Sequence, residues 1–301
     1  MSCGSEEMPP QLAARIFREI KDRMPLIHML PNAVSAAFCA DGLAALGARP
    51  LMAVSALEME EITQQADASV INLGQLDAGK LEAASLAVET AARVKKPLVL
   101  DPVGCGASQF RLQSVQDLLA LPWQGIIKGN RSEIYSIQQG RLTWEGIDAV
   151  EEHELSGRIP PGRVCLVTGA EDLVLWDKKS VRLSSGRGRF PTGISRYNIV
   201  GSGCLLGAVA GACYSVVSGR TAFFCGMDRQ GQGAAAAVSS VAASLGMAFA
   251  LEKAALAQGY GMAKTALLDA LSVLDGKEFE DWLWQGNWPE EGWTAWEAGC
   301  I

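Results

Sequence analysis

Apolar residues recur along this chain with two different spacings, and the two alternate. Stretches such as 11–24 repeat apolar residues every three or four positions, with Leu12, Ile16 and Ile20 on one face, as in an amphipathic helix. Short continuous apolar runs such as ASVINL at 68–73 are typical of buried strands. We expect helices at 11–24, 34–46, 59–66 and 81–94 and strands at 51–54, 68–73, 97–101, 126–127 and 164–168, with an edge pair at 173–176 and 181–183.

Strands that alternate with helices indicate an α/β fold with a mostly parallel sheet covered on both faces. Beyond Gly203 the chain becomes almost wholly helical. Ligands of such sheets bind beyond the carboxyl ends of the strands. The positions to examine are therefore Gly74, Asp101, the segment 128–133, and the pair Thr168 and Gly169.

No Pro/Ser-rich linker or charge block divides the chain, which predicts one domain over 1–278 and a Trp-rich tail over 279–301. We expect the tail to pack on its own surface or on a neighbouring subunit. The stretches 197–219 and 233–251 carry no charge but are rich in Ala, Gly and Ser rather than in the residues that drive membrane insertion. They are interpreted as closely packed inner helices.

The amino-acid composition of the chain argues against several classes of function. The net charge is −7 and there is no long Lys/Arg stripe, which argues against a nucleic-acid binder. Two histidines, His28 and His153, make a His-ligated metal site or a Ser-His-Asp triad a poor candidate. Eight scattered cysteines without a C-x-x-C pair indicate buried free thiols. The N-terminal segment shows no secretory pattern, so a cytoplasmic protein is expected.

Two motifs resemble nucleotide-binding signatures but lack essential parts. Gly74 to Lys80 matches G-x-x-x-x-G-K, yet Leu81 stands where a P-loop needs a hydroxyl for Mg²⁺. Asp77 is predicted instead to cap the helix that follows. Gly231-x-Gly233-x-x-Ala236 resembles a dinucleotide fingerprint, but no strand precedes it.

A stronger cluster combines Asp101, at the end of a strand, with Lys128 and Glu133 after the next strand. In a parallel sheet these strand ends meet at one cleft. Asp101 and Glu133 could share a Mg²⁺, which favours one or two carboxylates plus phosphate oxygens, and Lys128 adds a cation. The alternative is a turn acid and a helix-start acid beside a helix dipole, and spacing alone does not choose between them.

The sharpest candidate is Val200-Gly201-Ser202-Gly203-Cys204, which opens a long apolar helix. Glycines before a helix N-terminus allow backbone N–H groups to converge on an anion. A buried structural cysteine after a glycine turn remains the alternative.

Seven segments occur together in the order typical of one family: PLIHMLPNAV, GLAALGARPLMA, ASVINLGQL, LDPVGCGAS, IIKGNRSEI, LVTGAEDLVL and NIVGSGCLLGAVAGA. From about Pro25 to about Leu274 the chain resembles hydroxyethylthiazole kinases of thiamine salvage. The Asn130-x-x-Glu133 motif and the glycine turn also resemble the wider ribokinase-like superfamily. The resemblance implies a three-layer α/β/α ribokinase-like fold and ATP-dependent phosphorylation of the alcohol of 4-methyl-5-(2-hydroxyethyl)thiazole.

The resemblance also implies roles for single residues. Cys204 stands where related kinases place a catalytic Asp, at a glycine turn that binds the transferring phosphate. Asp101 and Glu133 would organise Mg²⁺. The remaining implied contacts are Met52, Gly201, Asn32 and Val34 for the thiazole substrate, and Lys128, Thr168, Gly169 and Gly203 for the nucleotide and its phosphates. A homotrimer with the thiazole site between subunits is expected, with Asn32 and Val34 reaching in from a neighbour.

Two further hypotheses stay open at this point. One is a kinase of the same fold that acts on another small primary alcohol. The other is a homologue that binds nucleotide or thiazole without turnover. Asp101, Glu133 and Cys204 favour turnover, whereas Lys128 in place of the usual Arg and Val200 in place of the usual Thr favour the non-catalytic reading.

Overall fold

The computed structural model describes residues 9–143, 162–177, 179–183, 199–219 and 233–287 of the chain. Eight strands form one sheet in these ranges: β1 (Leu26–Leu30), β2 (Arg49–Leu51), β3 (Ala68–Asn72), β4 (Leu98–Asp101), β5 (Gly125–Asn130), β6 (Arg163–Thr168), β7 (Asp172–Trp176) and β8 (Lys179–Leu183). The α-helices are α1 (Pro9–Arg23), α2 (Ala36–Ala45), α3 (Met59–Gln65), α4 (Ala78–Val94), α5 (Gln109–Ala120), α6 (Arg131–Gln139), α7 (Ser202–Val217), α8 (Ala234–Ala255), α9 (Tyr260–Leu271) and α10 (Lys277–Trp282).

The strand order is β2-β1-β3-β4-β5-β6-β7-β8. Strands β1 to β6 are parallel, and β7 and β8 extend the sheet as an antiparallel edge. The mostly parallel sheet and the edge pair predicted from the sequence are therefore confirmed. Because the central strands are parallel, their carboxyl ends lie along one edge, where the loops after β3, β4, β5 and β6 meet.

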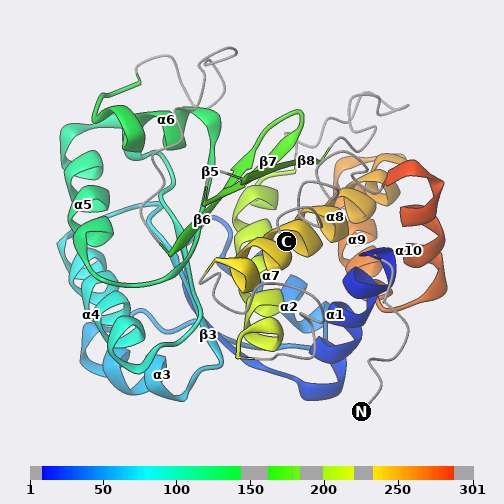
Figure 1. The fold of residues 1–301 in the computed structure, drawn as a ribbon, viewed down its shortest axis with the longest axis horizontal. Helices are drawn as coiled ribbons and strands as arrows, with labels where there is room; N and C mark the ends of the chain where they lie inside the picture. The colour runs from blue at the N-terminus through cyan, green and yellow to red at the C-terminus, as the bar shows by residue number, and fades with distance from the viewer. Residues whose placement is uncertain (1–8, 144–161, 178, 184–198, 220–232, 288–301) are drawn as a thin grey trace.

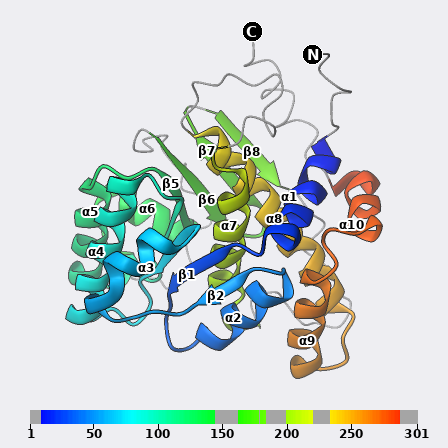
Figure 2. The same cartoon turned by 90° about the horizontal axis from the view of Figure 1, so that it is seen from below.

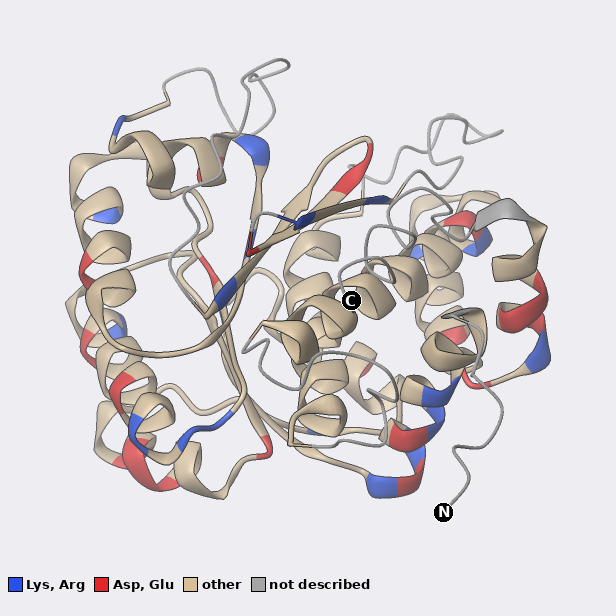
Figure 3. Ribbon diagram, in the orientation of Figure 1, with Lys and Arg blue, Asp and Glu red and all other residues tan. Residues whose placement is uncertain are grey.

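Helices cover both faces of the sheet (Figure 1). Helices α7 and α8 pack on one face, with α1, α2, α9 and α10 outside them, and α3 to α6 lie on the other face (Figure 2). Each face has its own apolar core. Charged residues gather on the outer helices, whereas α7 carries none along its length (Figure 3). The three-layer α/β/α architecture is the predicted one.

The two charge-free stretches form the inner helical layer. Helix α8 is long and apolar enough to cross a membrane, but 89% of its most apolar window is buried inside the protein. Helix α7 approaches the sheet so closely that a Cβ at Gly211 would lie 2.5 Å from Val70 Cγ2. The small residues in these helices therefore serve close packing within the protein.

The structure corrects some element boundaries. The second strand is Arg49–Leu51 rather than 51–54, because it is an edge strand with a proline, Pro50, in its middle. Strand β1 and helix α5 were not predicted, and α6 was anticipated only in the alternative that places Glu133 at the start of a helix. The signal for α5 was present in Leu112, Val115 and Leu118, which are buried at helical spacing.

The start of the predicted tail packs against the core. Phe279 and Trp282 stack with their rings 6.0 Å apart, and both meet Phe249 edge-on. The indole N–H of Trp282 donates to Glu252 Oε2 (2.7 Å). Trp288, Trp293 and Trp296 lie outside the described residues, and the division of the chain at 278 stays a prediction.

Candidate active site

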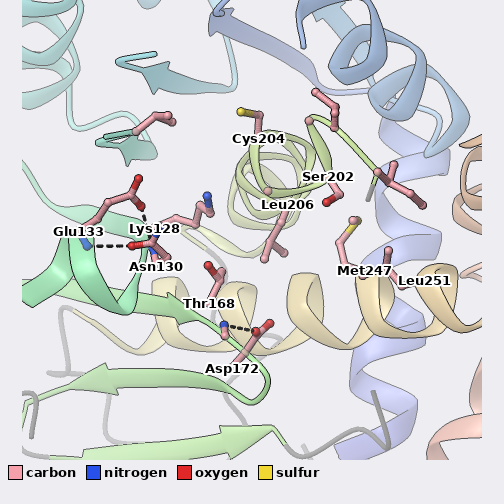
Figure 4. A pocket seen from close by; sticks show the side chains of 16 residues that line it. Lys128, Asn130, Glu133, Thr168, Asp172, Ser202, Cys204, Leu206, Met247 and Leu251 are labelled. Carbon is pink, nitrogen blue, oxygen red and sulfur yellow. Dashed lines mark hydrogen bonds between the residues drawn. The ribbon is translucent and has the colours of Figure 1, made fainter. Parts of the chain in front are cut away.

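A cavity of about 360 Å³ lies beyond the carboxyl ends of β5 and β6, beside the N-terminus of α7 (Figure 4). Four sets of residues line it: the loop after β4, the β5–α6 junction, the β6–β7 turn, and the first turn of α7 with apolar side chains of α7 and α8. They include Val103, Lys128, Asn130, Glu133, Thr168, Gly169, Asp172, Gly201, Ser202, Gly203, Cys204, Leu206, Met247 and Leu251.

The first turn of α7 is open toward this cavity. Gly201 stands at the N-cap with φ of +88° and supplies no capping side chain, and a Cβ there would lie 2.9 Å from Ser35 Cβ. The amide of Ser202 donates to Ile199 O (3.1 Å), and Leu205 N donates to Gly201 O (2.8 Å). The amides of Gly203 and Cys204 lie between them, where helix geometry provides no intrahelical acceptor. This turn has the form of an anion-binding helix N-terminus.

Lys128 brings a buried positive charge to the same place. Its Nζ lies 3.1 Å from Asp101 Oδ1, and both side chains are almost completely buried. Burial would lower the pKa of Lys128, but the carboxylates of Asp101 and Glu133 outweigh burial and raise it, so the ammonium stays charged. A Cβ at Gly203 would lie 3.5 Å from this Nζ, which places the charge beside the first turn of α7.

Asp101 is linked to Cys204 by two buried amides. Asn72 Nδ2 donates to the second oxygen of Asp101 (2.8 Å), and Asn72 Oδ1 accepts from Asn32 Nδ2 (2.9 Å). Asn32 Nδ2 also lies 3.2 Å from Cys204 Sγ, to which it donates. One hydrogen-bonded series thus runs from the buried ion pair to the thiol at the cavity wall.

Glu133 faces the cavity from the start of α6. Its Oε2 accepts from the amide of Asn130 (2.8 Å), whose side chain in turn accepts from Glu133 N, which completes a capping box. Its Oε1 accepts from Gly104 N (2.8 Å). Burial raises the pKa of Glu133, and the Lys128 charge and the two amides oppose this rise. Each carboxylate oxygen keeps a lone pair for a further partner.

The carboxylates present fit a Mg²⁺ ion that is held mainly by phosphate oxygens and water. No group of three or more His, Cys, Asp or Glu side chains suited to a metal occurs among the described residues, so a cage made by protein alone is absent from that part of the chain. Glu133 lines the cavity, whereas Asp101 is directed at Lys128 and Asn72. One carboxylate plus phosphate oxygens is a common arrangement for Mg²⁺.

Comparison with known proteins gives the same family along most of the chain. The model of the "Hydroxyethylthiazole kinase family" matches residues 17–277. The chain is 36% identical over 207 residues to a hydroxyethylthiazole kinase of Haemophilus influenzae, covering 67% of this chain and 76% of that protein. It is 34% identical over 206 residues to one of Listeria monocytogenes, covering 66% and 74%.

The chain belongs to the hydroxyethylthiazole kinase family. A solved hydroxyethylthiazole kinase from Pyrococcus horikoshii superposes with a TM-score of 0.69 at 28% identity, covering 87% of this chain and 93% of that one. A ribokinase-like superfamily protein from Enterococcus faecalis gives a TM-score of 0.55 at 10% identity, which speaks for the fold alone. The predicted family and the ribokinase-like fold are confirmed.

Some of the site residues predicted for this member of the hydroxyethylthiazole kinase family lie together in the structure, and others lie apart. Lys128, Glu133, Thr168, Gly169, Gly201, Gly203 and Cys204 share the cavity. Asn32 does not reach in from a neighbouring subunit as predicted: it is buried in its own chain, and its side chain donates to Cys204 of the same chain. Met52 is partly buried and packs against the apolar core, and Val34 is 64% exposed; neither lines the cavity.

Three features were missed or misread at the level of sequence. Asn72 was passed over although an amide that ends a fully buried strand is a signal in itself. Asp172, buried at the cavity wall, accepts from Gly169 N and from the Ser244 hydroxyl. Lys80 was considered only as part of an incomplete P-loop, whereas its Nζ donates to two loop carbonyl groups.

The remaining sequence predictions near the site can also be placed. Asp77 caps α4 as predicted, because its Oδ1 accepts from Lys80 N (2.8 Å). His28 is buried, and burial lowers its pKa to about 4, so it is neutral near pH 7. The described cysteines are free thiols, all buried except the partly exposed Cys204. His153 and Gly231 lie outside the described residues.

Proposed function

We propose that this protein transfers the γ-phosphoryl group of ATP to the hydroxyl of 4-methyl-5-(2-hydroxyethyl)thiazole, in the cytoplasm. The observation that carries the proposal is the uncapped N-terminus of α7, with a buried lysine beside it and a thiol on the same turn. Membership of the hydroxyethylthiazole kinase family supports the substrate, and the kinase family implies ATP.

The chemistry asks for positioning and charge neutralisation rather than for a covalent intermediate. The alcohol oxygen attacks the γ-phosphorus, the bond to the leaving oxygen of ADP breaks, and the alcohol gives up its proton. The amides of Gly203 and Cys204 and the ammonium of Lys128 would hold the oxygens of the transferring group. Donors that are already in place when charge develops stabilise it most effectively.

Cys204 would accept or orient the proton of the alcohol. Its Sγ is held by Asn32 and lies at the cavity wall, on the helix turn that is to receive the phosphate. A thiol is a modest base for an alcohol. Because the transition state of phosphoryl transfer is loose, little base strength is required.

Residues of this site would hold Mg²⁺, which when bound would supply positive charge against the charge of the phosphate groups. Glu133 would hold it, because this carboxylate faces the cavity and keeps lone pairs free of its two backbone donors. Asp101 would act one step further away, by fixing the position and charge of Lys128.

Thr168 and Gly169 are proposed to contact the nucleotide, since both line the cavity at the end of β6. Gly201, Met52, Asn32 and Val34 are proposed to contact the thiazole. The exposure of Val34 fits a homotrimer in which a neighbouring subunit completes that part of the site. The partly buried Met52 follows β2, which is the parallel neighbour of β1, so the loops that carry Met52 and Val34 leave the same edge of the sheet.

ADP release with Mg-ATP and the thiazole alcohol tests the proposal. We expect turnover that saturates with the alcohol and none with 4,5-dimethylthiazole, which lacks the hydroxyl. A thermal shift with the thiazole alcohol but no ADP release would refute the proposed activity and favour a non-catalytic homologue. Turnover with other primary alcohols but not with this one would move the assignment to a different substrate.

A further inference from the structure

Lys80 joins the loop after β1 to the loop after β3 at the catalytic edge of the sheet. It lies in the first turn of α4, and its Nζ donates to Pro31 O (2.7 Å) and to Gly74 O (2.5 Å). Pro31 precedes Asn32, and Gly74 follows Asn72 by two residues. The lysine therefore spans the two chain segments that carry both amides of the series leading to Cys204.

The contacts between these loops are close. A Cβ at Gly74 would lie 2.9 Å from Asn32 Nδ2 and 3.0 Å from Asn72 Oδ1. The amide of Gly74 donates to Asn72 Oδ1 (3.0 Å), and the amide of Ala33 donates to Gln75 Oε1 (2.8 Å). Interiors packed at this density transmit small displacements, so a shift of either loop must move the Asn32 amide relative to the thiol.

The lysine is half-buried, and burial lowers its pKa to about 8. Both of its hydrogen-bond acceptors are backbone carbonyl oxygens. A buried ammonium group requires such partners, and the two loops are therefore held at the distance that one Nζ can span.

We propose that Lys80 is a positioning residue for phosphoryl transfer: by joining the loops at Pro31 and Gly74, it sets the place of the Asn32 amide against Cys204 Sγ. The inference rests on the proposed function only for its kinetic readout. Lys80 belongs to the incomplete P-loop motif, but the role proposed here for it does not involve a phosphate. Lys80 is proposed to act through Asn32 on Cys204, the group proposed to meet the alcohol. Binding of ATP should therefore not depend on Lys80.

The test compares Lys80→Met with Lys96→Met. Lys96 follows the other end of α4, at the opposite edge of the sheet, and also donates to a backbone carbonyl, Ala66 O (2.7 Å). Both changes remove a lysine–carbonyl contact. We expect Lys80→Met alone to lower kcat/KM for the thiazole alcohol, by roughly tenfold to a hundredfold for a displaced catalytic group, with KM for ATP within about twofold. Lys80→Arg, which keeps N–H donors, should recover most of the loss.

A double-variant cycle shows whether Lys80 acts through Asn32. If it does, Lys80→Met should add no further loss in an Asn32→Ala background. Additive losses would overturn the proposal, as would equal kinetic losses in Lys80→Met and Lys96→Met.

A readout without turnover separates this proposal from the proposed function. Alkylation of Cys204 by iodoacetamide, followed by peptide mass spectrometry, should change in rate at least about threefold in Lys80→Met and not in Lys96→Met. An unchanged rate in Lys80→Met would overturn the positioning role. Absence of ADP release from the unaltered protein would instead contradict the proposed function and leave the alkylation result to decide on Lys80.

Discussion

Helices α4 and α7 both begin beside the edge of the sheet where the parallel strands end, but their N-termini differ. Asp77 caps α4 by accepting from Lys80 N, and the Lys80 side chain donates to two loop carbonyl oxygens. Helix α7 begins at Gly201, without a side-chain cap, next to the Lys128 ammonium. In α4 a side chain accepts from the first-turn amide of Lys80, whereas in α7 no N-cap side chain of the described residues accepts from the amides of Gly203 and Cys204.

This difference favours α7, rather than the better match to a phosphate-binding motif, as the proposed phosphate site. Gly74 to Lys80 fits the P-loop spacing, yet the carboxylate of Asp77 occupies the place at which a phosphate would be bound. Gly201 to Cys204 fits no such pattern, but a helix dipole, open amides and a buried cation converge there. Local positive potential of this kind does not depend on the net charge of −7.

The largest effect is expected from closing the N-terminus of α7. Gly203→Asp would place a carboxylate beside Lys128 Nζ and over the open amides, where it competes with phosphate. We expect kcat/KM for Mg-ATP to fall about a thousandfold, the upper range for loss of oxyanion donors. Gly203→Ala is the matched control, because its Cβ would make an ordinary 3.5 Å contact and bring no charge. Equal losses in both variants would point to crowding rather than to a phosphate site.

The next effect concerns the carboxylate that faces the cavity. Glu133→Gln keeps an oxygen for the capping box but loses the negative charge, so the fold should stay intact. We expect about a hundredfold loss of kcat and a higher Mg²⁺ requirement, measured by steady-state assays over a Mg²⁺ series. A variant with unchanged Mg²⁺ dependence would show that Glu133 is only a helix cap.

A smaller effect is expected at the thiol. Cys204→Ala should retain measurable activity, with a loss of about tenfold, since a weak base contributes less than the roughly hundredfold or more typical of general acid–base catalysis. Single-turnover assays of Cys204→Ala beside Glu133→Gln compare the two directly. Total loss of activity in Cys204→Ala with a mild loss in Glu133→Gln would contradict this prediction. It would mean that base catalysis contributes more to the rate than charge stabilisation does.

The smallest effect is expected at the capped helix. Asp77→Ala removes the side-chain acceptor of α4 and should lower the free energy of unfolding by about 1 kcal/mol, the usual value for an N-cap. Chemical denaturation measures this change. A loss of nucleotide binding in place of a loss of stability would mean that α4, too, holds phosphate.

Much of the fold follows from the chain because its signals are local. The strands ending at Asn72, Asp101 and Thr168 are short apolar runs, and the amphipathic helices show their periodicity directly. Strand β2 was misplaced because an edge strand with a proline has little pattern of its own. The arrangement of the site depends on partners far apart in sequence: Asn32 meets Cys204 across 172 positions. No spacing rule connects such partners, so the link from Asn72 through Asn32 to Cys204 and the contacts of Lys80 could be found only from the structure.

Binding of a non-hydrolysable ATP analogue with Mg²⁺, measured by titration calorimetry, tests most directly whether the open N-terminus of α7 is the phosphate site. The protein, Gly203→Asp and Asp77→Ala would be compared in the same buffer. We predict an affinity at least about tenfold weaker in Gly203→Asp, or roughly 1.4 kcal/mol, and an unchanged affinity in Asp77→Ala. Unchanged binding in Gly203→Asp, or an equal loss in Asp77→Ala, would contradict the assignment.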